Sequence, residues 1–298
     1  ARSEGFPGTQ VVNLGLIRGW GNELSVDIRA IETPRFGWNI GFHLANFKNR
    51  IEDLGGDEAI FAGITQHRQG FSIADIYLKK VLSAEITETG AIVPGTLMCD
   101  GGTGHHGVEM GGSPVACDDA PAVRWGHSQP TWELGISNSI NVGRFRFYAQ
   151  IDAAGGHMHE NASVGAAITS VGNTKMSLER KDPIFQAYRT VNREPLGLYD
   201  ASFARLREVS ATYSLPDRIA RYAAGAKRGS ITVAARNLAM IWTGQDGWRT
   251  ARSGMITPTI GDGRIWDPET RGSANLSASS QTVMPPLASA QLTVRLGF

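Results

Sequence analysis

Strict alternation of apolar and polar side chains marks the last part of the sequence. From Ala288 to Phe298 every second residue is apolar, and Ser, Gln, Thr, Arg and Gly occupy the positions between them. Successive side chains of a β-strand point to opposite faces, so the pattern predicts a strand with one apolar and one polar face. Chain ends usually fray unless something holds them, so we expect this strand to be paired up to its final residue.

The same alternation recurs earlier in the chain and predicts about eight strands, mostly paired by tight turns. The expected hairpins join Glu23–Ile31 to Trp38–Ala45 and Trp132–Val142 to Phe145–Ala153. Further strands are expected at Val209–Leu215 and Ser230–Ile241, with a short helix after Pro216 between them, and a weaker strand at Phe71–Ala84.

Long segments without a clear period alternate with the tight turns. They are Asn46–Gly70, Thr87–Gln129, Gly156–Asp200 and Thr243–Pro285. Such long connections are uncommon in compact soluble domains and usually carry function. Short turns at one end of the strands and long loops at the other are the layout of outer-membrane barrels.

The periodicity alone fits two architectures. In a soluble sandwich the apolar faces pack inward, whereas in a membrane barrel they face lipid and the charged faces line a wet interior. Trp38 and Trp132 lie at ends of expected strands, where an interfacial aromatic belt would place them, and this favours the barrel. No apolar run reaches the roughly 20 residues of a membrane-spanning helix, but a spanning strand needs only about 9–11.

Charge and cysteine content narrow the classes of function. The 29 basic and 28 acidic residues nearly cancel, so the chain has no electrostatic footprint for nucleic acid. The 36 Gly and 13 Pro indicate many turns. Cys99 and Cys117 flank a Gly-rich segment and predict a disulfide if the protein is extracytoplasmic, or two free thiols in a reducing compartment.

No candidate for catalysis or for a cofactor survives inspection. Gly102–Gly107 matches G-x-G-x-x-G but lacks the preceding strand and following helix of a dinucleotide site, so a loop is expected. The histidines have no zinc spacing and are interpreted as solvated loop residues: His105, His106, His157 and His159. We expect no enzyme activity, no metal and no cofactor.

Several stretches together resemble the C-terminal part of a TonB-dependent outer-membrane receptor of the SusC/RagA-like branch. The most specific is "SFARLREVSATYSLP", Ser202–Pro216. "GHSQPTWELGISNSINVGRFRFYAQIDAAGG" is similar to the branch's Pro-x-Trp hairpin, and "SITVAARNLAMIW" is similar to its strand with Arg-Asn-Leu. The terminal strand ending in Phe298 resembles the signal that barrel-assembly machinery recognises. The order and spacing of these motifs run through nearly all 298 residues.

The resemblance implies an all-β fold of antiparallel transmembrane strands, in which residues 1–298 are the C-terminal portion of a 22-stranded barrel without the plug domain. It implies import of a large ligand, a glycan or peptide, across a bacterial outer membrane. Outer-membrane lipid, TonB (through a missing N-terminal region) and a SusD-like lipoprotein are the implied partners. The long loops would contact ligand or lid, with Trp125, Trp248 and Trp266 as candidate ligand residues.

Two alternatives remain open from the sequence. The chain could form a small complete outer-membrane barrel with a structural or adhesive role. Side chains would fill the interior of such a barrel. It could also form a secreted, soluble β-sandwich that binds carbohydrate.

Overall fold

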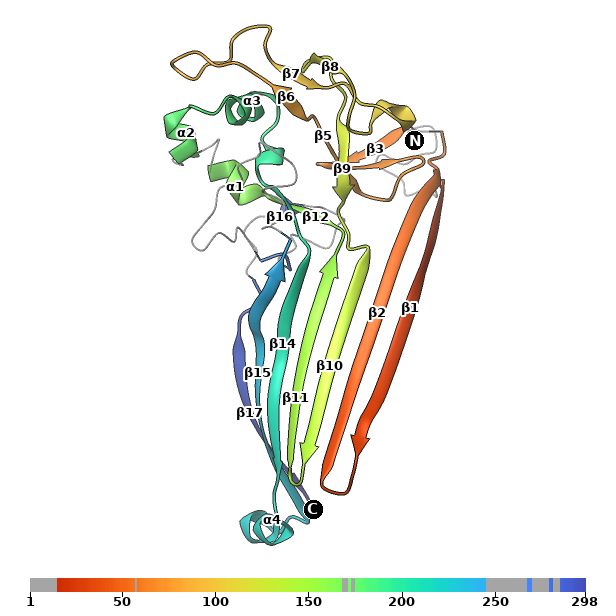
Figure 1. Cartoon of the computed structure of the whole chain (residues 1–298), viewed down its shortest axis with the longest axis vertical. Coiled ribbons are helices and arrows are strands. Elements are labelled where there is room, and N and C mark those ends of the chain that lie inside the picture. Colours follow the sequence, from red (N-terminus) through yellow and green to blue (C-terminus); the bar gives the residue numbers. More distant parts are fainter. Residues whose placement is uncertain are drawn as a thin grey trace, which may run out of the picture.

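The computed structural model describes residues 15–56, 58–167, 171–172, 175–244, 267–269, 279–280 and 285–298. The fold is all-β, as the alternation predicts. Its largest element is an antiparallel seven-stranded sheet of long, tilted strands in the order β1-β2-β10-β11-β14-β15-β17 (Figure 1). These strands are β1 (Leu16–Glu32), β2 (Phe36–Asp53), β10 (Trp132–Val142), β11 (Phe145–Gly155), β14 (Phe203–Ser214), β15 (Arg228–Thr243) and β17 (Ser289–Gly297).

Both expected hairpins are present, but the first is longer than the alternation indicates. β1 pairs with β2 from Leu16–Asp53 down to Glu32–Gly37, with a register shift at each end. β10 pairs with β11 from Trp132–Gly155 to Val142–Phe145 without a shift. The ends of β1 and β2 beyond the predicted bounds are rich in Gly, Asn and Arg. Pairing with the neighbouring strand, and not side-chain periodicity, holds them extended.

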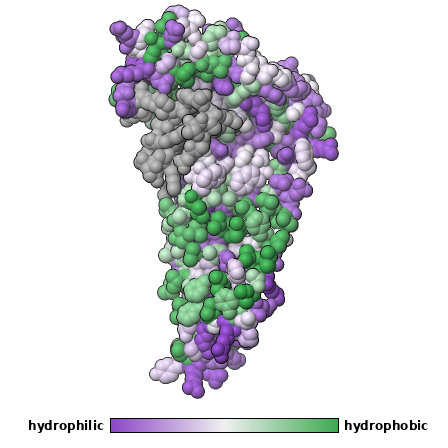
Figure 2. All heavy atoms as spheres, viewed as in Figure 1, coloured by the Kyte–Doolittle hydropathy of each residue, from purple (hydrophilic) through white to green (hydrophobic). Residues whose placement is uncertain are grey.

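Apolar side chains cover one face of the large sheet. Figure 2 shows them gathered over the strands, between hydrophilic regions at the two ends of the molecule. Large apolar residues of this face are unusually exposed, for example Val233 at 55% and Leu292 at 68%. Soluble monomers rarely expose a contiguous apolar area of this kind, so the face needs a partner or an apolar medium.

The polar side chain of Asn138, which lies among the apolar residues of this face, has a hydrogen-bond partner on the neighbouring strand. Trp38 Nε1 donates a hydrogen bond of 3.1 Å to Asn138 Oδ1 from the neighbouring strand. Trp38 lies near the start of β2 and Trp132 opens β10, so the two indoles lie at opposite ends of the sheet. This is the placement at strand ends that the sequence predicts.

Beyond one end of the sheet, the described residues between Leu54 and Thr131 and between Gly156 and Ser202 form a cap. The prediction that these segments are irregular is wrong, because they build three small sheets and three helices (Figure 1). The strands are β3 (Ala59–Ala62), β4 (Thr65–Arg68), β5 (Asp75–Leu78), β6 (Val81–Ser83), β7 (Met98–Asp100), β8 (Pro114–Ala116), β9 (Val123–His127), β12 (Met158–Asn161), β13 (Leu198–Asp200) and β16 (Ser279–Ser280). The helices are α1 (Ala162–Ala166), α2 (Lys175–Glu179) and α3 (Pro183–Val191). The strands are too short for a period to be visible.

The expected strand at Phe71–Ala84 is also wrong in detail. It splits into β5 and β6, which belong to different sheets. The two adjacent lysines mark the division: Lys79 Nζ donates to the carbonyl of Cys117, and the carbonyl of Lys80 accepts from the Asp100 amide. The chain therefore changes direction where both lysines turn toward the disulfide-bearing strands.

The cap has its own buried core, which surrounds a disulfide. Cys99 and Cys117 are bonded to each other, as the sequence predicts for an extracytoplasmic protein. They pack with Phe185 and Tyr188 of α3, both 2% exposed. The Val81 amide donates to the Tyr188 hydroxyl, and burial raises the pKa of that phenol to about 12. The bonded loop is thereby held against a helix.

The Gly-rich loop between the cysteines folds around a carboxylate of its own. Asp100 is 1% exposed and accepts hydrogen bonds of 2.8–2.9 Å from the backbone amides of Gly102, Gly111 and Gly112. Gly102 has φ of 70°, a conformation in which residues with a Cβ are strained. Within Gly102–Gly107 the amides of Gly102, Thr103 and Gly107 already donate to Asp100, Glu109 and Gly104, which agrees with the expectation of a loop.

At the opposite end of the sheet the turns are short, apart from the connection between β14 and β15. That connection holds α4 (Asp217–Ala224), the helix expected after Pro216 (Figure 1). None of the helices in the described residues is long and apolar enough to cross a membrane.

Replacing Asp100 tests the account of the Gly-rich loop. In Asp100→Asn an NH₂ group replaces one carboxylate oxygen. In one orientation it faces the Gly111 N–H donor, and in the other the bonds from Gly102 and Gly112 are lost. We therefore expect a loss of about 2–4 kcal/mol in the free energy of unfolding of the cap. Asp118→Asn, at an exposed position directly after the loop, is the matched control and should change the free energy of unfolding by less than about 0.5 kcal/mol. Denaturant unfolding of the purified protein measures both, and equal effects would contradict the account.

Candidate functional site

The candidate site lies on the polar face of the large sheet, opposite the apolar band. Polar side chains on this face bond to one another within and across strands. Tyr148 donates to Gln150, and Gln150 donates to Asp152 at 2.8 Å along β11. Contacts between strands join Ser25 to His43, Arg146 to Ser139, Thr212 to Thr232 and Arg236 to Glu208. The face is thus a continuous hydrogen-bonded surface.

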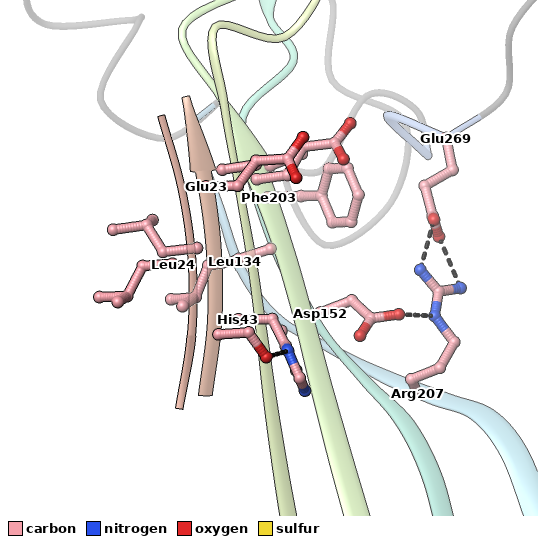
Figure 3. A pocket seen from close by; sticks show the side chains of 15 residues that line it. Glu23, Leu24, His43, Leu134, Asp152, Phe203, Arg207 and Glu269 are labelled. Atoms are coloured by element: carbon pink, nitrogen blue, oxygen red, sulfur yellow. Dashed lines mark hydrogen bonds and ion pairs between the residues drawn. The ribbon is translucent and has the colours of Figure 1, made fainter. Parts of the chain in front are cut away.

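A hollow of about 530 Å³ opens on this face near the cap end (Figure 3). Four carboxylates line it against a single guanidinium, so its wall carries net negative charge. In Figure 3 Asp152, Arg207 and Glu269 lie on one side of the strands, and Leu24 lies on the other. The polar lining comprises Glu23, Ser25, His43, Glu133, Asp152, Arg207 and Glu269. Such a wall can bind and orient a polar ligand through charge-assisted hydrogen bonds.

Two arginines of β14 hold a distant segment against this wall. Arg205, whose side chain is 5% exposed, contacts Asp267 and lies 2.8 Å from Glu269. Arg207 bonds Glu269 on one side and Asp152, at 2.8 Å, on the other. The Glu269 amide in turn donates to Asp267 Oδ1, which closes a turn. Residues 267–269, from the connection between β15 and β17, are therefore fixed by ion pairs to the polar face.

A β-bulge brings both arginines to the polar face. The pairing of β11 with β14 shifts register between Gln150 and Ile151, and Arg207 is the extra residue on β14. The other neighbour of β14, strand β15, is irregular at the same level: Asn237 adopts φ of 53° and accepts a hydrogen bond of 2.9 Å from Arg207. A bulge lets two consecutive residues share a face and re-aims a side chain. Arg205, Arg207 and Glu208 can then share the polar face, and Arg207 lines the hollow.

A serine and a histidine contact each other in the hollow. Ser25 Oγ lies 2.9 Å from His43 Nδ1. A serine hydrolase also needs a carboxylate that orients the imidazole through its other nitrogen. In the part of the chain that the structure describes, no ion pair joins His43 to a carboxylate. The pair belongs to the polar lining of the hollow.

Trp125, one of the three candidate ligand tryptophans, lies in the cap and is not available to a ligand. Trp125 is 4% exposed and packs with Ile76, Leu78 and Leu198, while its Nε1 donates to the Leu78 carbonyl at 3.0 Å. It is a core residue of the cap, in correction of the prediction from loop position alone. Trp248 and Trp266 lie outside the described residues.

Two of the loop histidines also differ from the expectation. His157 and His159 are each 2% exposed, with their rings 5.1 Å apart, so they are buried and not solvated. His157 directly precedes β12 and His159 lies within it, and all four residues of β12 are buried. His105 and His106 are exposed, as expected. Within the described ranges no group of three or more His, Cys, Asp and Glu side chains could hold a metal ion.

The sequence prediction missed Arg205 and Arg207. It began this strand at Val209 because "RLRE" breaks the alternation. Two adjacent charged residues at the margin of a regular apolar pattern were the available signal, since a bulge produces this break. Asp267 and Glu269 carry no comparable signal, because their partners are distant in sequence. Asp267 is 62 residues from Arg205, and Glu269 is 62 residues from Arg207.

Comparison with known proteins finds likeness in structure and none in sequence. No family model matches the chain, and no curated protein matches it. A structure of the RagAB peptide importer in the "closed-closed" state superposes over 100% of this chain with a TM-score of 0.70 and 16% identity. A structure of the RagAB peptide transporter covers 100% of it at 0.67 and 16%. An "open-open" state of the importer covers 95% at 0.65 and 14%.

The superposition extends over only part of those proteins. This chain covers 31% of the first two matched chains and 29% of the third. The likeness establishes a shared fold for the whole of this chain. It concerns under a third of each transporter chain.

The ion pairs of Arg205 generate a prediction about residues 267–269. In Arg205→Met two carboxylates lose a buried partner, a change that costs about 3–5 kcal/mol when a buried pair is broken. We expect hydrogen exchange at the Glu269 amide to accelerate at least about tenfold, as part of that loss appears as local opening. Arg236→Met is the control, since it removes an ion pair with Glu208 that is 55% exposed on the arginine side. Unchanged protection of Glu269 would contradict the anchoring role.

Proposed function

We propose that this chain is the C-terminal part of the β-barrel of a TonB-dependent outer-membrane transporter of the SusC/RagA-like branch. In this role its strands separate lipid from a polar interior through which a large ligand, a peptide before a glycan, is imported. The observation that carries the proposal is the division of one seven-stranded sheet into an apolar exposed face and a hydrogen-bonded polar face.

The two faces of the large sheet suit two different surroundings. Backbone polar groups in a bilayer must bond internally, and a β-sheet can achieve this only when its strands pair laterally. The strands of β10 and β11, at 11 residues each, have the length of spanning strands. Their apolar side chains suit lipid, while Glu133, Asp152 and Arg207 require water or polar partners.

The structural likeness supports the choice of ligand. The matched proteins are named as a peptide importer, and the match extends over the entire chain. The polar hollow, with both charge signs, the Ser25 hydroxyl and the His43 imidazole, can pair with backbone groups of a peptide as well as with sugar hydroxyls. The cap, in the segments Thr87–Gln129 and Gly156–Asp200, would meet the ligand or a SusD-like lipoprotein first. TonB would act through a region outside this chain.

Adjacent substitutions on β15 distinguish a lipid-facing strand from a strand of a soluble protein. Val233 lies on the apolar face and Thr232 on the polar face, where it bonds Thr212. In a membrane, Val233→Arg should destabilise the protein by about 2–4 kcal/mol, and Thr232→Arg should be tolerated. Denaturant unfolding after insertion into vesicles measures the difference.

A soluble sandwich gives the opposite expectation for Val233. An exposed position would accept arginine with a change within about 0.5 kcal/mol, and the protein would remain in solution without detergent. That result would overturn the membrane location and leave the carbohydrate-binding sandwich as the working interpretation.

Transport itself is tested in cells. Disruption of the gene should abolish saturable uptake of labelled oligopeptides, and collapse of the proton gradient with an ionophore should do the same in cells that keep the gene. Labelled oligosaccharides in parallel cultures identify the ligand class. Uptake of both ligands that persists without the gene would contradict the proposal, and so would uptake that persists under the ionophore.

A further inference from the structure

The helix at the turn end of the sheet exposes two large side chains, Ile219 and Tyr222, and buries the small Ala220. In α4, Tyr222 is 95% exposed and Ile219 is 51% exposed, whereas Ala220 is fully buried. At 100° per residue, Arg218, Ile219, Arg221 and Tyr222 share the surface opposite Ala220. A surface helix of a globular protein normally has the reverse arrangement. The exposed surface of α4 therefore requires a partner.

This surface is strongly basic. Between Asp217 and Arg228 the chain carries four basic side chains and one acidic side chain. In the described part of the chain, no ion pair involves Arg218 or Arg221. The short turn between β10 and β11 adds the exposed Arg144, whose guanidinium reaches the Leu215 carbonyl beside α4. The partner is thus expected to be anionic.

The helix is fixed at the border of the apolar band. Leu215 donates its amide to Gly229, and Lys227 donates its amide to Gly297, so both ends of the connection are tied to strand ends. Just above, Tyr213 and Phe145 form an aromatic pair on the apolar face with ring centroids 4.8 Å apart. The apolar surface ends in aromatic residues there, and the basic helix follows directly.

We infer that α4 docks on the headgroup layer of an anionic phospholipid leaflet. The inference rests on the proposed membrane location and adds a lipid-binding element to it. Arg218 and Arg221 bind lipid phosphates, Tyr222 lies at the level of the headgroups and Ile219 reaches toward the acyl chains. Tyrosine is enriched at this depth, and arginine keeps its charged end in the polar layer while its stem covers apolar surface.

Charge continuity favours lipid over a protein partner. An anionic leaflet is adjacent wherever the apolar band is embedded, and it requires no shaped complement. Each basic residue near such a surface raises the docking equilibrium constant roughly fivefold, which corresponds to about 1 kcal/mol. The two arginines together account for a shift of roughly 30-fold.

The test places an environment-sensitive fluorophore on Tyr222→Cys. Cys99 and Cys117 are bonded to each other, so position 222 offers the free thiol among the described residues. The labelled full-length protein is inserted into vesicles of phosphatidylcholine, with or without phosphatidylglycerol, and quenching is measured with brominated lipid and with aqueous iodide. We expect lipid quenching to dominate with phosphatidylglycerol and iodide quenching to dominate without it.

Charge variants separate this inference from the proposed function. Arg218→Gln/Arg221→Gln should weaken docking by roughly 30-fold without preventing insertion, because glutamine is a good helix former. Lys175→Gln/Lys181→Gln, at the cap end, is the matched control and should leave docking unchanged. Insertion is followed independently, by protection of the strands from protease in the same vesicles.

The outcomes are distinct. A protein that does not insert refutes the membrane location itself. A protein that inserts but leaves position 222 equally open to iodide in both vesicles overturns the lipid inference alone. Exposure in vesicles combined with protection in isolated outer membranes overturns it too, and identifies a protein partner for α4. Salt-sensitive lipid quenching that the arginine variant loses supports the inference.

Discussion

The two-residue repeat of the β-strand is the constraint on which this structure depends. Successive side chains in each strand of the large sheet lie on its apolar face and its polar face in turn, so a shift of one residue would exchange the faces. Register must therefore be held over many residues, and β10 and β11 keep it without interruption. Where the chain departs from the repeat, at Arg207 and Asn237, the departure concentrates charge on the polar face and creates the anchoring site for residues 267–269.

This constraint also explains which features could be predicted from the sequence. Alternation identifies the hairpins and the terminal strand because each residue's environment is set by its parity. It locates the strand ends poorly, since the outer parts of β1 and β2 are held by backbone pairing and not by side-chain type. It fails at "RLRE", where a bulge breaks the period. The helix α4 was predictable because Pro216 opens it and Gly225, with φ of 66°, ends it.

The cap lies beyond the reach of such reasoning for a different physical reason. Its strands have two to five residues, too few to display a period, and its core forms between segments distant in sequence. Trp125 illustrates the limit. An aromatic residue in a long loop suggests a ligand contact, but its indole is buried and bonded to Leu78. Burial of His157 and His159 likewise depends on β13, which returns to pair with β12 some 40 residues later.

The loop between Cys99 and Cys117 is closed twice, once by the disulfide and once by the amides that converge on Asp100. Its conformation is therefore specified from within and makes little demand on the strands below. The large sheet has the opposite property, because the place of each residue in the strand assigns its side chain to the apolar or the polar face. Sequence change among related proteins should follow that division. Exposed positions of the loop can diverge freely and change the surface of the cap. Strand positions can vary only among apolar residues on the apolar face and among polar residues on the polar face.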